Sequence, residues 1–377
     1  MKILIAPDSF KESLSALEVA RNIEKGIKTV IPETDCILLP MADGGEGTVQ
    51  SMVDATGGQI INTVVHDPLM REINGFFGIL GNGRTAVIEM AAASGIELLQ
   101  ETEKDPYHTT TFGTGELLRS AIEKGCSEII IGIGGSATND GGMGMASALG
   151  VRFHDKYGKE IPQGGKYLGE IEEIDASEII SEAKTIHFTI ASDVSNPLCG
   201  PEGASYVFGP QKGATPGQVS ILDAGLNHFG DLIEKMSGKT IKNVPGAGAA
   251  GGLGAGLMAF LNADMKPGFE VVKEITHLED HIKNVDIVIT GEGKIDSQTQ
   301  YGKTPFGVAQ TAKKQGKKVI AFAGTVGDDI DILYENCFDH ILPISEKPVP
   351  LKYSLENAPD LLQNAAQRMM RLLNIGM

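Results

Sequence analysis

Apolar runs alternate along most of the chain with segments whose apolar residues recur at helical spacing. Residues 2–6 form one such run, and the segment after them predicts an amphipathic helix over 16–30. Ser15 and Glu18 have the S-x-x-E spacing of a capping box at the start of that helix. Another helix is predicted at 46–55, and further strands at 36–39, 128–133, 186–191, 285–290, 318–323 and 340–344. This alternation is typical of parallel sheets covered by helices on both faces.

One region departs from the alternation. The runs 58–65, 75–81 and 84–90 predict neighbouring strands, and Gly81-Asn82-Gly83 predicts a tight turn between the last two. The sequence therefore predicts an α/β protein with two α/β domains. Residues 1–60 and 286–377 would form a discontinuous, doubly wound, Rossmann-like domain with a parallel sheet, and residues 61–285 an inserted second domain with a mixed sheet.

Composition narrows the class of protein. The chain has 377 residues, more than one hydrophobic core usually serves, and 41% hydrophobic against 21% charged residues is an ordinary globular balance. It contains no apolar run long enough to cross a bilayer. Pro7 and Asp8 interrupt the first apolar run too early for a signal peptide, so we expect a cytoplasmic protein.

Charge and cysteine content exclude several functions. With 32 basic and 49 acidic residues the net charge is −17, which argues against nucleic acid or an anionic membrane as partner. A small anionic substrate stays compatible with this charge, because it needs only a local group of cations. The 4 cysteines lie far apart without a C-x-x-C pair, so we expect free thiols. The sequence does not determine the oligomeric state, and a homo-oligomer is compatible with it.

Polar, glycine-rich loops follow many of the predicted strands, where ligands of doubly wound sheets bind. Any one of these loops could simply cap a helix or form a turn. Together they favour a site assembled from several loops, which are residues 7–13, 41–48, 132–142, 192–197 and 291–297.

The loop at 132–142 allows two interpretations. Gly132, Gly134 and Ala137 match G-x-G-x-x-A, with Asp155 at roughly the offset of a ribose-binding carboxylate, so an NAD site is one candidate. The loop is unusually polar for that role, and its hydroxyls and backbone N–H groups suit phosphate oxygens, so we favour a nucleoside triphosphate. The Gly-Lys-Thr triplets at 238–240 and 302–304 lack the first glycine of a P-loop.

Long stretches of the sequence resemble the bacterial glycerate kinases, over essentially the whole chain. The stretches are IAPDSFKESLSA, MADGGEGT, VIEMAAASG, TTTFGTGEL, IGIGGSATNDGGMG, ASDVSNPLCGPEGAS, FGPQKGA, VPGAGAAGGLG and ITGEGKIDSQT. The resemblance implies ATP-dependent phosphorylation of D-glycerate, in the branch that yields 2-phosphoglycerate. It also implies two α/β domains with the active site in the cleft between them.

The resemblance does not assign roles, so we infer them from position at strand ends and from the needs of phosphoryl transfer. Asp193 is the expected acceptor of the hydroxyl proton, with Asp8 as its substitute, and Lys11 is expected to hold the transferring phosphate or the substrate carboxylate. The expected nucleotide-binding residues are Gly134, Gly135, Ser136, Thr138, Asn139 and Lys212. The expected Mg²⁺ ligands are Glu292 and Asp296.

Three alternatives stay open at this point. The same kinase could act on the other hydroxyl and yield 3-phosphoglycerate. The match at 132–137 would also suit an NAD-dependent oxidoreductase of hydroxy acids. A non-catalytic sensor of sugar acids would bind glycerate without turnover and would tolerate loss of Asp193.

Overall fold

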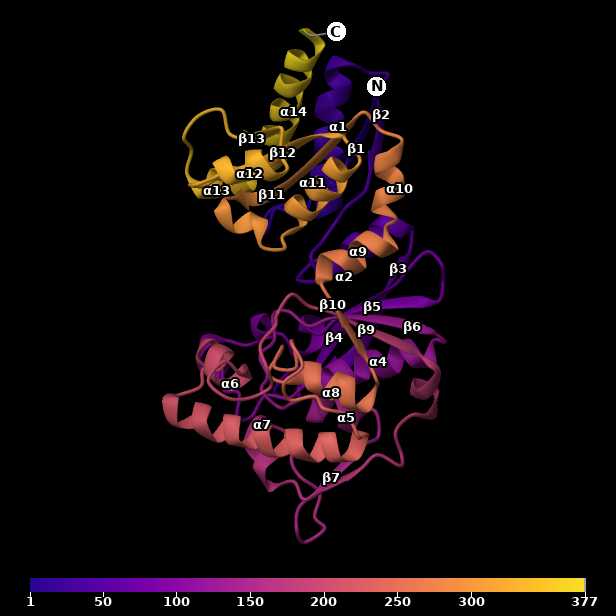
Figure 1. Cartoon of the computed structure of the whole chain (residues 1–377), viewed down its shortest axis with the longest axis vertical. Coiled ribbons are helices and arrows are strands. Elements are labelled where there is room, and N and C mark those ends of the chain that lie inside the picture. The colour runs from indigo at the N-terminus through magenta and orange to yellow at the C-terminus, as the bar shows by residue number, and fades with distance from the viewer. Residues whose placement is uncertain (376–377) are drawn as a thin grey trace. The chain divides into compact units, whose positions relative to one another are not determined.

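A computed structural model describes residues 1–375, and its contacts divide the chain into two compact units (Figure 1). The first unit contains residues 1–43, residues 50–57 and the chain from Phe269 onward. The second contains residues 44–49 and 58–268. Residues 269–285, which the sequence analysis placed in the insertion, thus group with the first unit.

The first unit is built on a five-stranded parallel sheet with the order β13-β12-β11-β1-β2. Its strands are β1 (Lys2–Ile5), β2 (Asp35–Leu38), β11 (Ile287–Ile295), β12 (Lys318–Val326) and β13 (His340–Pro343). Ile3 lies opposite Ile287 on one side and Cys36 on the other. The strands expected near both chain ends therefore pair in one sheet, as the alternating pattern predicted.

Helices cover both faces of this sheet because the direction of the crossovers changes. Its helices are α1 (Ala16–Val30), α9 (Gly268–Ile275), α10 (Leu278–Lys283), α11 (Thr304–Lys314), α12 (Asp331–Asn336), α13 (Leu351–Glu356) and α14 (Ala358–Ile375). From β1 the chain moves to β2 at one edge, whereas from β11 it moves through β12 to β13 at the other. Right-handed crossovers then put α1 and α11 on opposite faces. The order reverses between β1 and β11, which makes that position the switch point of a doubly wound sheet.

The core of the first unit forms where α1 and α14 pack on the sheet. Ile3 and Ile5 lie in one buried cluster with Ile23 of α1 and Ala366 of α14. The predicted capping box is present: Ser15 Oγ accepts from the Glu18 backbone N–H at 3.3 Å, and the Glu18 carboxylate accepts from the Ser15 backbone N–H at 2.9 Å. These two bonds fix the first residue of α1, which agrees with the sequence prediction.

The second unit is built on a mixed six-stranded sheet with the order β10-β9-β6-β5-β4-β3. Its strands are β3 (Gln59–His66), β4 (Glu72–Ile79), β5 (Thr85–Glu89), β6 (Glu128–Gly132), β9 (His187–Ala191) and β10 (Asp264–Lys266). The pairs β3–β4 and β4–β5 are antiparallel, and the rest are parallel. The backbone N–H of Gly83 donates to Leu80 O in the β4–β5 turn. The mixed sheet and its tight turn are confirmed.

The remaining elements surround this sheet. They are α3 (Ala91–Ser94), α4 (Phe112–Glu123), α5 (Met143–Ala148), α6 (Ala204–Phe208), α7 (Pro216–Ser237), α8 (Leu253–Phe260) and the small pair β7 (Arg152–His154) and β8 (Glu173–Asp175). Helix α2 (Thr48–Thr56) contains residues of both units. Phe153 and Phe229 belong to the large buried cluster of the second unit.

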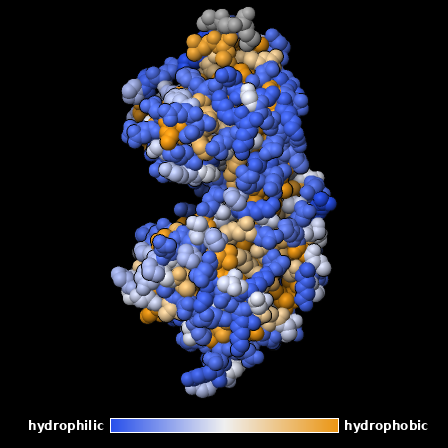
Figure 2. Space-filling view, in the orientation of Figure 1, coloured by the Kyte–Doolittle hydropathy of each residue, from blue (hydrophilic) through white to orange (hydrophobic). Residues whose placement is uncertain are grey.

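Surface and thiol chemistry agree with the composition. In the view of Figure 2, hydrophilic residues cover most of each unit, with apolar residues scattered among them. Within residues 1–375, the search for a helix apolar and long enough to span a membrane finds none. All four cysteines are free, and Cys126 and Cys337 are buried.

Close packing of α1 on α14 requires glycine at position 26. A Cβ atom there would lie 2.3 Å from Gln363 O and 2.7 Å from the Ala366 Cβ. We expect Gly26→Ala to lower the free energy of unfolding by about 2 kcal/mol, as overpacking does. Gly217 in α7 is the matched control, because a Cβ there meets nothing within 4 Å. Chemical denaturation should show Gly217→Ala unchanged or more stable, and equal stability of Gly26→Ala would contradict the packing.

Candidate active site

The loops that leave β1 and β11 meet beside the switch point of the first unit. The Asp8 backbone N–H donates to Gly291 O at 2.9 Å, which carries the pairing of these two strands beyond the end of β1. Residues 10–14 then form a tight turn in which the backbone N–H groups of Ser13 and Leu14 both donate to Phe10 O. Glu12 has a φ of 61° in this turn, a left-handed conformation that a residue other than glycine adopts at a cost of about 1 kcal/mol.

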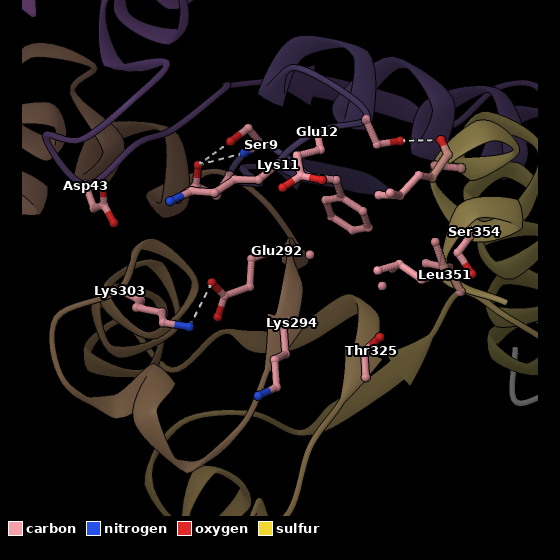
Figure 3. A pocket seen from close by; sticks show the side chains of 18 residues that line it. Ser9, Lys11, Glu12, Asp43, Glu292, Lys294, Lys303, Thr325, Leu351 and Ser354 are labelled. Atoms are coloured by element: carbon pink, nitrogen blue, oxygen red, sulfur yellow. Dashed lines mark hydrogen bonds and ion pairs between the residues drawn. The ribbon is translucent and has the colours of Figure 1, made fainter. Parts of the chain in front are cut away.

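These loops line a pocket of about 430 Å³ that lies within the first unit (Figure 3). Asp8, Lys11 and Glu292, which the sequence analysis selected, are among its lining residues. The others are Ser9, Phe10, Glu12, Ser13, Asp43, Gly293, Lys294, Lys303, Gly324, Thr325, Ile344, Leu351, Ser354, Leu355 and Ala358. The pocket thus takes residues from the ends of β1, β11, β12 and β13 and from α13 and α14.

Two carboxylates of the pocket hold protons more tightly than usual. Burial raises the pKa of Glu292 to about 7, and the charge of Asp8 adds to this rise while Lys303 opposes it. Lys303 Nζ lies 3.4 Å from the Glu292 carboxylate, which also accepts from Thr299 Oγ1 at 2.9 Å. Burial raises the pKa of Asp8 to about 6, Asp43 adds to the rise, and Lys11 opposes it. The lining as a whole contains four carboxylates, Asp8, Glu12, Asp43 and Glu292, and three lysines.

That excess of carboxylate fits a divalent cation only in part. Asp8 and Glu292 are oxygen donors whose raised pKa values a cation would relieve. Asp296 instead pairs with Lys294 at 2.8 Å and accepts from the Gln298 backbone N–H, capping the turn that follows. Across residues 1–375, no group of three or more His, Cys, Asp or Glu side chains could hold a metal ion. Mg²⁺ commonly binds through one or two carboxylates plus substrate phosphates, which this pocket allows.

The second unit carries its own polar group, at the end of β6. Lys212 is 3% exposed, and its Nζ donates to Ser136 Oγ and to Thr138 O, both at 2.7 Å. Burial lowers the pKa of Lys212 to about 7, and the charge of Asp140 opposes the fall. The predicted partners Ser136, Thr138 and Lys212 are therefore brought together.

Asp140 fixes the shape of this loop. Its carboxylate accepts from the backbone N–H groups of Thr111 at 2.8 Å, Gly142 at 3.1 Å and Gly144 at 3.2 Å. Burial raises its pKa, and these hydrogen bonds oppose the rise. Three donors that converge on one buried carboxylate hold residues 140–144 against the start of α4.

The other predicted residues of the second unit differ in exposure. Gly134 and Gly135 are exposed, and Gly135 has a φ of 70° that favours glycine. Asn139 is fully buried, and its amide donates to Ser205 Oγ at 3.0 Å. Thr138 Oγ1 and Asn139 Oδ1 are buried without a hydrogen-bond partner among the described residues. Both side chains are 0% exposed, so these oxygens belong to the packing of the loop and not to its surface.

Asp193 stands at the exit of β9, the neighbour of β6. It is exposed, and its Oδ1 accepts from the Gly268 backbone N–H at 3.1 Å. The carboxylate is therefore oriented by the backbone while it faces solvent.

The NAD interpretation does not fit the structure. In a dinucleotide-binding turn the helix begins within the glycine fingerprint, so that its N-terminus meets the pyrophosphate. Here β6 ends at Gly132, and the next helix, α5, begins at Met143, well past Ala137. Asp155 lies in an exposed turn, where it accepts from the backbone N–H groups of Tyr157 and Lys159. We therefore reject the oxidoreductase alternative.

Sequence reasoning missed three residues that shape these sites. Asp43 follows β2 and lines the pocket, and Asp140 organises the loop after β6. Lys303 lies directly before α11 and pairs with Glu292. A signal for it existed in the Gly-Lys-Thr triplet at 302–304, because a lysine at a helix start after a strand can serve an anion without the full P-loop spacing.

The structure defines an α/β protein with a switch point lined by lysines and carboxylates, and the comparisons with known proteins identify its family. The sequence profile described as "Glycerate kinase family" matches residues 3–374, and the chain belongs to that family. It is 51% identical to the glycerate kinase of Bacillus subtilis, over 97% of this chain and 96% of that protein. It is 48% identical to the glycerate 2-kinase of Escherichia coli, over 100% of this chain and 99% of that protein.

A solved structure agrees with the sequence relatives. The crystal structure of a Salmonella typhimurium LT2 protein assigned to glycerate kinase 2 superposes with a TM-score of 0.92 at 47% identity. The match covers 100% of this chain and 99% of that one. The expected family and fold are both confirmed.

The raised pKa of Glu292 predicts a pH dependence of stability. A carboxyl whose pKa is about 7 in the folded protein, against an ordinary value of 4.5, stabilises the fold at low pH and loses that contribution as the pH rises from about 4.5 through 7. The free energy of unfolding should therefore decline between pH 4.5 and 8, and Glu292→Gln should remove up to about 3 kcal/mol of that decline. Denaturant titrations at several pH values measure it, with Glu356→Gln, an exposed side chain, as control. An unchanged pH slope in Glu292→Gln would contradict the prediction.

Proposed function

We propose that this protein transfers the γ-phosphoryl group of ATP to D-glycerate and yields 2-phosphoglycerate. The observation that carries the proposal is the full-length relation, at 48% identity, to the Escherichia coli protein named glycerate 2-kinase. Membership of the glycerate kinase family supports the class of reaction, and the relative supports the position of the transferred group.

Phosphoryl transfer needs cations on the moving charge and a metal that bridges phosphate oxygens. Lys11 and Lys303 are the side chains of the first unit suited to phosphate oxygens, because both line the pocket beside carboxylates. Mg²⁺ would be held by Glu292, and when bound it would neutralise charge on the phosphates. Asp296 is the second proposed Mg²⁺ ligand, although it already forms an ion pair with Lys294.

In the second unit, the loop after β6 is suited to anionic oxygens. The exposed backbone of Gly134 and Gly135 and the Ser136 hydroxyl would meet the phosphates, with Lys212 supplying positive charge through Ser136. Thr138 and Asn139 are buried and would hold the loop in the conformation that binds.

Asp193 is the proposed proton acceptor for the attacking hydroxyl, with Asp8 as the substitute. Asp193 is exposed at a strand exit and accepts a hydrogen bond from the Gly268 backbone N–H, which suits a carboxylate that must meet a small substrate.

The reaction itself can be tested directly. We expect the purified protein with D-glycerate, ATP and Mg²⁺ to release ADP and to form 2-phosphoglycerate, identified by ³¹P NMR against both isomers. Formation of 3-phosphoglycerate would keep the kinase and overturn the position of transfer. Absence of ADP release in the presence of D-glycerate would overturn the proposed reaction.

Replacing Asp193 tests the proton acceptor. Asp193→Asn can keep the hydrogen bond from the Gly268 N–H, so we expect the fold unchanged and kcat reduced by roughly 100-fold or more. Asp155→Asn, in an exposed turn of the same unit, is the control and should keep wild-type kcat. Wild-type kcat in Asp193→Asn would remove this residue from the mechanism and also favour a non-catalytic role for its loop.

A further inference from the structure

We infer that the pocket of the first unit binds the nucleoside of ATP, with the base against α13 and the phosphates toward Lys11 and Lys303. This inference rests on the proposed function and extends it, because it assigns the nucleoside to residues that sequence analysis did not select. The residues added are Phe10, Ile344, Leu351, Ser354, Leu355 and Ala358.

The size of the pocket separates the two substrates. A volume of about 430 Å³ falls within the range of roughly 300–1,000 Å³ that ligand sites of drug size occupy. A three-carbon acid would leave most of that space empty, whereas a nucleotide would fill it. Its place at the reversal of strand order, between β1 and β11, is also where doubly wound sheets bind nucleotides.

The two sides of the pocket differ in chemistry. Figure 3 shows Asp43, Lys11, Glu292 and Lys303 on one side and Leu351 and Ser354 of α13 on the other. The apolar residues of the lining are Phe10, Ile344, Leu351, Leu355 and Ala358, and of these Leu351 and Leu355 belong to α13. A nucleotide has the same division, with an apolar face on its base and charge on its phosphates.

Leu351 supports an apolar ligand surface. It is 70% exposed beside the pocket, while Phe10 and Ile344 are 4% and 1% exposed. An aromatic base against Leu351 would remove apolar area from water and gain free energy in proportion to that area.

The charged side is suited to phosphates that carry a cation. Lys11 and Lys303 line it beside the acids Asp8 and Glu292. The phosphates would pair with the lysines, and their accompanying Mg²⁺ would relieve the carboxylates.

A hydrogen bond connects α13, on the apolar side, to the turn on the phosphate side. Ser13 Oγ donates to Leu355 O at 2.7 Å and so ties α13 to the turn that carries Lys11. At Gly293 a Cβ would meet only Lys11 N and Phe10 Cα, each at 3.9 Å, so the glycine leaves room beside this turn.

The loop after β6 is less suited to a nucleoside. The parallel strands β5, β6, β9 and β10 follow one another across the sheet in chain order, so the order does not reverse at β6. Lys212, which contacts this loop, is 3% exposed and already donates to Ser136 and Thr138. We therefore assign that loop to anionic oxygens and not to the base.

The test compares nucleotide and phosphate binding in matched variants. Isothermal titration with Mg²⁺ and either ATP or tripolyphosphate is performed on wild type, on a Leu351→Ser/Leu355→Ser double variant and on Tyr353→Ser. Tyr353 lies on the same helix, is 46% exposed and is not among the described lining residues. We expect the double variant to raise the Kd for ATP about tenfold and the Kd for tripolyphosphate less than twofold. Tyr353→Ser should match wild type for both.

A second variant guards against a folding defect in the first. Gly293→Leu adds a side chain to the lining at a position where its Cβ has room, and it should weaken ATP binding about tenfold or more, with a melting temperature that shows the variant is folded. Unchanged ATP affinity in both folded variants would overturn the inference, as would an equal loss for tripolyphosphate in the double variant.

The same variants separate this inference from the proposed function. If wild type phosphorylates glycerate and both variants keep the wild-type KM for ATP, the function stands and the nucleoside site falls. If wild type shows no phosphorylation of glycerate, the function falls, while the ATP titrations still decide the nucleoside site.

Discussion

The parallel pairing of β1 with β11 is the interaction on which the rest of the first unit depends. It joins a strand from the start of the chain to one that begins at Ile287, and the Asp8–Gly291 hydrogen bond carries the pairing into the loops. The crossover connections that follow these two strands run toward opposite edges of the sheet. They therefore leave an opening at the carboxyl ends of β1 and β11. The pocket, its carboxylates and its lysines all follow from that opening.

Much of this fold could be read from local patterns. The start of α1 was predictable because Ser15 and Glu18 satisfy backbone donors within four residues of chain, so no distant contact is needed. The mixed sheet was predictable because Gly81-Asn82-Gly83 is a turn signal between two strand patterns. The selection of Asp8, Lys11 and Glu292 followed from one rule, that loops after parallel strands share an edge, and the structure brings these three into one pocket.

Other features depend on contacts between distant segments and leave no local trace. Lys212 meets Ser136 and Thr138 across more than 70 residues of chain, and its lowered pKa follows from burial that the sequence does not show. Asp296 looked equivalent to Glu292, but its neighbour Lys294 engages it in an ion pair. Lys303 was set aside with a failed motif, although its place before α11 was the relevant signal.

The discontinuity of the first unit also governs the order in which the nascent chain can fold. β1, α1 and β2 leave the ribosome early but lack their central neighbour until β11 has been synthesised. By then residues 58–268 are complete and can already have formed their own sheet. The apolar residues Ile3, Ile5 and Ile23 therefore lack their partners in α14 throughout most of translation.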